Sequence, residues 1–153
     1  MEYLFRGFTT EKGEQKIIVN GKEYQGEWVY GYYFCLHHMD NRMHIHHFII
    51  PENISIPKER PIGEIQIEVI PETVGQFTGL TDKNGKKIFA GDRIFWNSQY
   101  GVVKFGDYET SDGHKKLGFY IDWDFLCWLS ESIVIATKHE PCEVIGNIHE
   151  EAQ

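Results

Sequence analysis

The sequence predicts an all-β protein. Its apolar segments are short and rich in β-branched and aromatic residues, and no long segment has the period of a helix. Residues 65–69 alternate apolar and polar side chains, as a half-buried strand does. Turn-forming pairs, such as Asn20-Gly21 and Asn84-Gly85, separate the segments. The expected strands lie within 16–19, 28–34, 44–50, 64–70, 93–96, 101–105, 118–122 and 132–137.

A nine-residue pattern occurs twice in the chain. Lys22–Tyr30 (KEYQGEWVY) aligns without gaps to Lys87–Phe95 (KIFAGDRIF), and six of the nine positions are identical or similar. Each copy follows an Asn-Gly pair that can open a hairpin. The later glycine allows a sharp bend, the acid after it can bond to the backbone, and the β-branched residue then begins a core strand. The pattern indicates two related barrel-like halves.

Residues 91–94 (GDRI) and 101–103 (GVV) resemble the paired strands of an SH3-like barrel, joined by a short loop. Such barrels bind peptides or nucleic acids through aromatic residues on one face. Alternation puts Ile94 and Trp96 on one side of their strand and Phe95 on the other. The aromatic candidates for a binding surface are Tyr30, Tyr32, Trp96 and Tyr100.

Four of the five prolines lie between residues 51 and 71. Proline has no amide hydrogen, so it weakens a β-ladder. We therefore expect one protein of residues 1–153 with three parts. These are an N-terminal β half (1–50), a proline-rich crossover (51–71) and a C-terminal SH3-like barrel half (72–153).

Composition narrows the class of protein. The chain is 41% hydrophobic and 14% aromatic, which predicts a packed core. Its net charge of −8 disfavours sequence-blind binding to nucleic acid, which depends on Lys and Arg. The first residues do not resemble a signal peptide, and no apolar run has the length of a membrane span. Three cysteines without a Cys-x-x-Cys pair indicate free thiols and a reducing cytoplasm.

Residues 35–48 (CLHHMDNRMHIHHF) contain five of the eight histidines. A two-residue turn at Asp40-Asn41 would bring four N and S ligands of the kind zinc accepts onto one face of a hairpin. These are Cys35, His37, His44 and His46. A different register would separate them. Two other interpretations stay open: histidines satisfied by solvent or backbone, and a histidine-rich subunit interface that weakens below about pH 6.

The segment 78–87 (TGLTDKNGKK) is rich in glycine and lysine but does not fit a P-loop. Turn chemistry explains it better, because Asp82 can begin a turn and Asn84-Gly85 can adopt positive φ. A basic face for nucleic acid would consist of Lys83, Lys86, Lys87 and Lys104.

Catalytic motifs are absent from the sequence, among them Gly-x-Ser-x-Gly and His-Glu-x-x-His. Asp122 and Asp124 share a strand face, but two acids without a third ligand are typical of a solvated surface. We therefore expect no enzyme activity.

The segment 72–95 (ETVGQFTGLTDKNGKKIFAGDRIF) resembles the signature of the YopX family of phage and prophage proteins. Three more segments agree in the family's order: LFRGF at 4–8, GEWVYGYYF at 26–34 and CEVIGNIHE at 142–150. The resemblance implies an all-β fold of SH3-like barrels, a phage or prophage origin and a bacterial cytoplasmic setting. It implies no activity and no catalytic residues.

The function expected from these observations is that of a non-catalytic binding or assembly module. Its expected partner is a second copy of itself, because aromatic-rich sheets leave edges and faces to cover, or else a host or phage protein. Two alternatives stay open: a nucleic-acid-associated barrel, and a metal-dependent enzyme that uses zinc at the 35–48 hairpin. No other cofactor and no membrane contact are expected.

Overall fold

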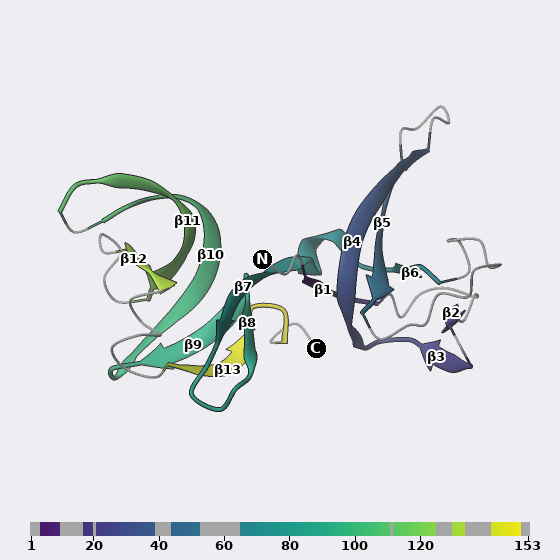
Figure 1. The fold of residues 1–153 in the computed structure, drawn as a ribbon, viewed down its shortest axis with the longest axis horizontal. Helices are drawn as coiled ribbons and strands as arrows, with labels where there is room; N and C mark the ends of the chain where they lie inside the picture. Colours follow the sequence, from purple (N-terminus) through teal and green to yellow (C-terminus); the bar gives the residue numbers. More distant parts are fainter. Residues whose placement is uncertain are drawn as a thin grey trace. The chain divides into compact units, whose positions relative to one another are not determined.

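The computed structural model describes residues 4–9, 17–19, 21–38, 44–52, 65–110, 112–124, 130–133 and 142–150. Their secondary structure is predominantly antiparallel β-strand, with a short 3₁₀ helix, which confirms the all-β prediction. No helix in these ranges is long and apolar enough to cross a membrane. The elements are β1 (Phe5–Phe8), β2 (Ile17–Val19), β3 (Lys22–Tyr24), β4 (Trp28–His38), β5 (His44–Pro51), β6 (Ile67–Glu68), η2 (Pro71–Thr73), β7 (Gly75–Thr81), β8 (Lys87–Phe89), β9 (Asp92–Trp96), β10 (Gln99–Glu109), β11 (Lys115–Trp123), β12 (Ser130–Ser132) and β13 (Glu143–Asn147) (Figure 1).

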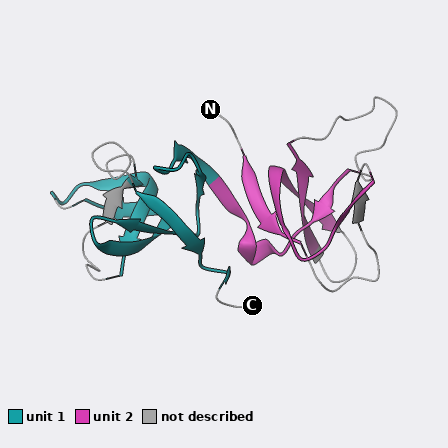
Figure 2. Ribbon diagram, turned by 90° about the horizontal axis from the view of Figure 1, so that it is seen from below, with its two compact units in different colours: residues 1–2, 77–153 teal, residues 3–76 magenta. Residues whose placement is uncertain are grey.

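The chain forms two compact units (Figure 2). The N-terminal unit contains residues 3–76, and the C-terminal unit contains residues 77–153 with residues 1–2. The chain passes from one unit to the other within β7. The first residues of this strand pair with β1, and Phe77 pairs with β8.

The segment predicted as a proline-rich crossover, 51–71, contributes to the N-terminal unit instead. Pro51 ends β5, and the two residues of β6 pair with Phe48 and Ile49 of β5. Residues 53–64, which hold two of the prolines, lie outside the described residues. The passage to the C-terminal unit therefore lies further along the chain than we expected.

In the N-terminal unit, β6, β5, β4, β1 and β7 are neighbours in that order, and β2 pairs with β3. Residues that alternate inward on these strands build one core, which consists of Val29, Ile49, Ile65, Ile67 and Val69. Gly7 on β1 lets this core close, since a Cβ there would come within 2.9 Å of the Val69 side chain.

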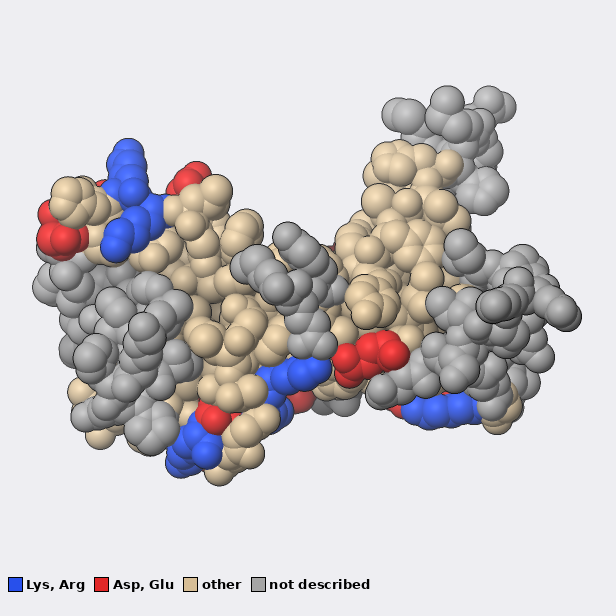
Figure 3. All heavy atoms as spheres, in the orientation of Figure 1, with Lys and Arg blue, Asp and Glu red and all other residues tan. Residues whose placement is uncertain are grey.

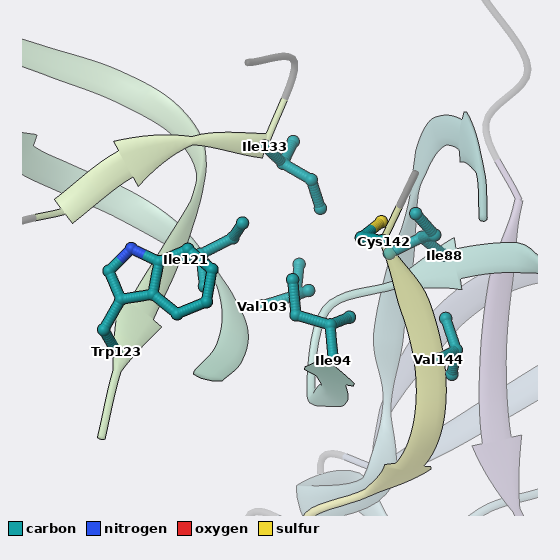
Figure 4. Close-up of a cluster of buried hydrophobic side chains, with 8 residues drawn as sticks. All are labelled: Ile88, Ile94, Val103, Ile121, Trp123, Ile133, Cys142 and Val144. Atoms are coloured by element: carbon teal, nitrogen blue, oxygen red, sulfur yellow. The ribbon is translucent and has the colours of Figure 1, made fainter. Parts of the chain in front are cut away.

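In the C-terminal unit, the strand order is β12-β11-β10-β9-β13. The core of this unit consists of Ile88, Ile94, Val103, Ile121, Trp123, Ile133, Cys142 and Val144 (Figure 4). Strands β9 and β10 are joined by a two-residue turn in which Asn97 and Ser98 both have positive φ. Both central residues of a type I′ turn have positive φ, and this turn matches the twist of paired strands.

The SH3-like barrels are not confirmed. Among the described strands no sheet closes on itself: β12 and β13 form the two ends of the C-terminal sheet, and neither pairs with the other. The predicted pairing of GDRI with GVV is present, because Ile94 pairs with Gly101 and Arg93 with Val102. Local pairing was thus readable from the sequence, whereas barrel closure depends on where the end strands lie.

The repeated nine-residue pattern has the same backbone course in both units. In each copy a short strand, β3 or β8, leads through a positive-φ glycine into a core strand, β4 or β9. The glycines are Gly26, with φ of 61°, and Gly91, with φ of 86°. The β-branched residues that follow, Val29 and Ile94, each lie in the core of their own unit.

Candidate functional site

Strands β4 and β5 form a long hairpin whose register differs by one residue from the predicted one. Cys35 pairs with His47 and His37 pairs with Ile45. The predicted turn at Asp40-Asn41 lies outside the described residues, but five residues separate the last observed pair, His38 and His44. The observed pairs therefore do not match the predicted ones.

The core determines this register. Val29 on β4 and Ile49 on β5 are both buried in the same cluster, so both must point to the same face of the sheet. The observed register pairs odd-numbered residues of β4 with odd-numbered residues of β5 and meets this requirement. The predicted register paired odd with even, which would have placed one of the two side chains on the solvent face.

The corrected register separates the predicted zinc ligands. Cys35 and His37 share one face with His47, whereas His46 pairs with Leu36 on the opposite face. The side chain of His44 is not among those described. Within the described part of the chain, no three His, Cys, Asp or Glu residues are placed so that they could hold a metal ion.

Two of the hairpin histidines have partners within the N-terminal unit. The Nδ1 atom of His46 lies 2.7 Å from a carboxylate oxygen of Glu68 on β6. The Nδ1 atom of His47 lies 2.5 Å from the hydroxyl of Tyr33, and the two rings stack. Both partners are side chains, whereas the sequence led us to consider solvent or backbone groups as partners.

One face of the hairpin is aromatic, and three of its large side chains are exposed to solvent. We call it the aromatic face, and it consists of Tyr30, Tyr32, Phe34 and Leu36 on β4 with His46, Phe48 and Ile50 on β5. The exposed fractions are 40% for Tyr30, 57% for Tyr32 and 45% for Leu36. On the other face, Ile45 is 48% exposed. Large apolar side chains that gather on an exposed surface mark interaction sites.

The two strands of the hairpin also lack formal charge. Neither β4 nor β5 contains a Lys, Arg, Asp or Glu, so its strands are neutral at pH 7 apart from any protonated histidine. In Figure 3 the described part of this hairpin is tan on the side in view, whereas both signs of charge occur around the β10–β11 hairpin. The sequence contained this signal, but the prediction followed the histidines and missed it.

A shallow pocket lies beside the aromatic face in the same unit. Its volume is about 190 Å³, and its lining consists of Lys22, Tyr24, Trp28, Val29, Tyr30, Pro51 and Glu52. The Lys22 ammonium lies 4.4 Å from the centre of the Tyr24 ring and bonds to Glu27. A pocket of this size suits a side chain of a protein partner better than a drug-sized ligand.

The two other aromatic candidates lie in the C-terminal unit. Trp96 packs against the core and stacks on Trp123, with ring centres 5.5 Å apart, so it is a core residue rather than a contact surface. Tyr100 is exposed and touches the ring of Phe95. The predicted alternation of Ile94 and Trp96 against Phe95 is confirmed.

Three of the four candidate basic side chains have partners in their own unit. Lys83 forms an ion pair with Glu143, and Lys104 forms one with Asp122. The Lys87 ammonium lies 5.4 Å from the centre of the Phe77 ring. Lys86 is exposed, and its amide bonds to Asp82. Carboxylates thus neutralise part of the face that nucleic acid would need.

Asp82 closes the lysine loop, as turn chemistry predicted. Its carboxylate is buried and accepts hydrogen bonds from the amides of Asn84, Lys86 and Val144. Burial alone would raise the pKa of the Asp82 carboxyl, but the three amides and the Lys86 charge outweigh burial and hold this pKa below its usual value. Gly85 has the expected positive φ, whereas Asn84 does not. This loop is therefore a structural turn.

The remaining candidates are two aspartates and the cysteines. Asp122 bonds to Lys104, and Asp124 lies in a bend after β11. Cys35 is exposed and free. Burial, together with the nearby Asp82 carboxylate, raises the pKa of the Cys142 thiol. Cys127 lies outside the described residues.

The chain is thus a two-unit antiparallel β protein, in which a long hairpin has aromatic strands without formal charge. A family model described as YopX protein matches residues 4–153, and the chain belongs to the YopX family. No curated protein and no solved structure matched it significantly.

Proposed function

We propose that the protein is a non-catalytic binding or assembly module, encoded by a phage or prophage, that associates with itself through the β4–β5 hairpin. The observation that carries this proposal is the aromatic face. It combines several large exposed apolar side chains with the absence of formal charge along both strands.

Burial of this face would release a substantial hydrophobic free energy. A fully buried Leu or Phe side chain contributes about 1.5–3 kcal/mol relative to an exposed one, and Tyr32 and Leu36 are each about half exposed. Charge favours the same site. Two chains of net charge −8 repel each other, and β4 and β5 themselves add no carboxylate to this face, where Glu68 of β6 already bonds to His46.

Two alternatives have less support. A nucleic-acid-binding role needs free cations, whereas Lys83 and Lys104 pair with carboxylates. A zinc enzyme at the hairpin needs the set of Cys35, His37, His44 and His46 on one face, and the register divides them. Family membership supports a phage or prophage origin and a bacterial cytoplasmic setting, where a host or phage protein could also bind the aromatic face.

Sedimentation velocity over a range of protein concentrations tests self-association. We expect an oligomer that Leu36→Lys weakens by about tenfold or more in dissociation constant, because a lysine on the aromatic face must lose its hydration. The matched control is Leu117→Lys on β11, where the leucine is 69% exposed and charged residues already surround it. A wild-type chain that stays monomeric at all concentrations would contradict the proposal.

A further inference from the structure

The outer half of β4 has an open edge. β1 pairs with Trp28, Val29, Tyr30 and Gly31 only, whereas β4 continues to His38. On the edge that β1 occupies, no described strand pairs with residues 32–38. Figure 1 shows β4 extending well beyond β1. An exposed strand edge of this kind is a template for another strand.

The backbone groups that face this edge follow from the hydrogen bonds nearby. The amide of Glu52 donates to the carbonyl of Tyr30, so even-numbered residues of β4 exchange hydrogen bonds with β5. Odd-numbered residues therefore face the β1 edge, as the bond from the Thr9 amide to the Glu27 carbonyl shows. Tyr33, Cys35 and His37 thus direct their N–H and C=O groups outward from the open edge.

The C-terminal unit contains a comparable edge that is protected. β9 pairs with Gln99–Val102 of β10, and no described strand continues that pairing along the rest of β10 to Glu109. This outer hairpin carries charges of both signs, namely Lys104, Asp107, Glu109, Lys115 and Lys116. Charged side chains on edge strands prevent pairing with other chains. The open edge of β4 lacks this protection.

We infer that two copies of the chain join by antiparallel pairing of β4 with β4, about a two-fold axis at Cys35. The inference rests on the self-association proposed above and specifies its contact: the aromatic faces of the two copies lie side by side in one continuous sheet, with Phe34 opposite Leu36 of the second copy. Among the described residues that face the open edge, Tyr33, Cys35 and His37, Cys35 is the central one, so the register that pairs all three places Cys35 opposite Cys35 of the second copy. Tyr33 then lies opposite His37 of the second copy, and the reverse. A two-fold axis makes this contact self-complementary and closed.

A second copy suits this edge better than a foreign strand. Antiparallel self-pairing uses the same outward N–H and C=O groups on both sides, so each donor meets an acceptor. The neutral edge also lets two chains of net charge −8 approach without opposed carboxylates.

Thiol cross-linking tests the register directly. Opposed residues in a hydrogen-bonded antiparallel pair have Cα atoms about 5.5 Å apart, which is within disulfide range. Cys35 is exposed, whereas Cys142 is buried. Oxidation of the full chain with copper–phenanthroline should give a covalent dimer in the wild type and in Cys127→Ser. The dimer should be lost in Cys35→Ser, which should still self-associate.

A proline variant tests the backbone pairing. Cys35→Pro removes one outward N–H and leaves the bonds to β5 intact, since proline is tolerated where a strand N–H faces solvent. We expect its dissociation constant to rise about tenfold or more relative to Cys35→Ser. Circular dichroism of both variants checks that the fold is retained.

The outcomes separate the inference from the proposed function. An oligomer that neither cross-links at Cys35 nor weakens in Cys35→Pro overturns the β4 contact and leaves self-association standing. A wild-type chain that is monomeric in sedimentation overturns both. A monomer whose β4 edge is instead occupied by another protein's strand would also overturn the inference, and would point to strand addition by that partner.

Discussion

Each unit contains a strand that bends at a positive-φ glycine and continues as a core strand. In the N-terminal unit the bend is at Gly26, between β3 and β4, and in the C-terminal unit it is at Gly91, between β8 and β9. The acid after the glycine differs. Asp92 is 1% exposed and accepts a hydrogen bond from the Phe89 amide, whereas Glu27 is half-buried and pairs with Lys22 near the surface.

The comparison shows what each position controls. Glycine and the β-branched residue are shared, so they set the backbone course in both copies. The length of the acidic side chain decides whether it accepts a hydrogen bond from the backbone of its own turn. A short Asp side chain reaches the amide three residues earlier. The long hairpins differ in the same way: β10–β11 carries charges and β4–β5 has none.

The largest expected effect is at the buried acid. Asp92→Ala leaves the Phe89 amide buried without this acceptor, so we expect the free energy of unfolding of the C-terminal unit to fall by about 2–3 kcal/mol. Glu27→Ala removes an exposed ion pair and should cost about 0.5 kcal/mol. Urea denaturation of both variants measures the difference. Equal losses would show that the two turns are held in the same way.

The buried Asp82 and the more exposed Glu27 should differ in how their contributions to stability depend on pH. The pKa of Asp82 is lowered in the folded state, so its stabilisation is complete above the unfolded pKa, about 3.9, and is lost as the pH falls through the folded pKa. Asp82→Asn should lower the free energy of unfolding by about 2 kcal/mol at neutral pH. The difference in free energy of unfolding between this variant and the wild type should shrink in acid. The control is Glu27→Gln, at a half-buried acid near the surface. A difference between Asp82→Asn and the wild type that does not depend on pH would contradict the assignment.

The charge contrast between the hairpins can be altered by pH. Histidine is the side chain that ordinarily titrates between pH 5 and 8, and β4 and β5 together contain five of the chain's eight histidines. The groups that face these histidines are Glu68 at His46 and the Tyr33 hydroxyl at His47. We expect the dissociation constant for self-association to rise about tenfold between roughly pH 7.5 and 5.5.

Sedimentation at the two pH values measures this effect. The double variant His37→Asn with His47→Asn should retain more of its self-association in acid than the wild type, because fewer histidines remain on the hairpin. The control variant His114→Asn alters the other hairpin, where His114 lies near Asp112, and should behave as the wild type does. Unchanged sedimentation in acid would exclude histidine control of the contact.

The smallest expected effect is at the shared glycines. Gly26→Ala and Gly91→Ala each place a Cβ on a positive-φ backbone, which costs about 1 kcal/mol. The two losses in free energy of unfolding should agree within about 0.5 kcal/mol if both copies have the same backbone conformation at the bend. Thermal denaturation of both variants tests this, and a much larger loss in one copy would show that the bends are not equivalent.

The sequence by itself determined the all-β class, the bend in each nine-residue copy and the turn held by Asp82. These features depend on residues close together in the chain, such as Asp82 with Asn84 and Lys86, so local chemistry is sufficient to predict them. The family was also readable, because its segments keep their order along the chain.

Only the tertiary structure decided the register of β4 and β5, the place of Trp96 and the openness of the sheets. The register follows from burial of Val29 with Ile49, a contact between residues twenty positions apart that no turn signal specifies. That requirement moved Cys35 and His46 to opposite faces and left the aromatic face as the candidate site. Packing between distant residues decides which face of a strand is buried, and a shift of one residue reverses that choice.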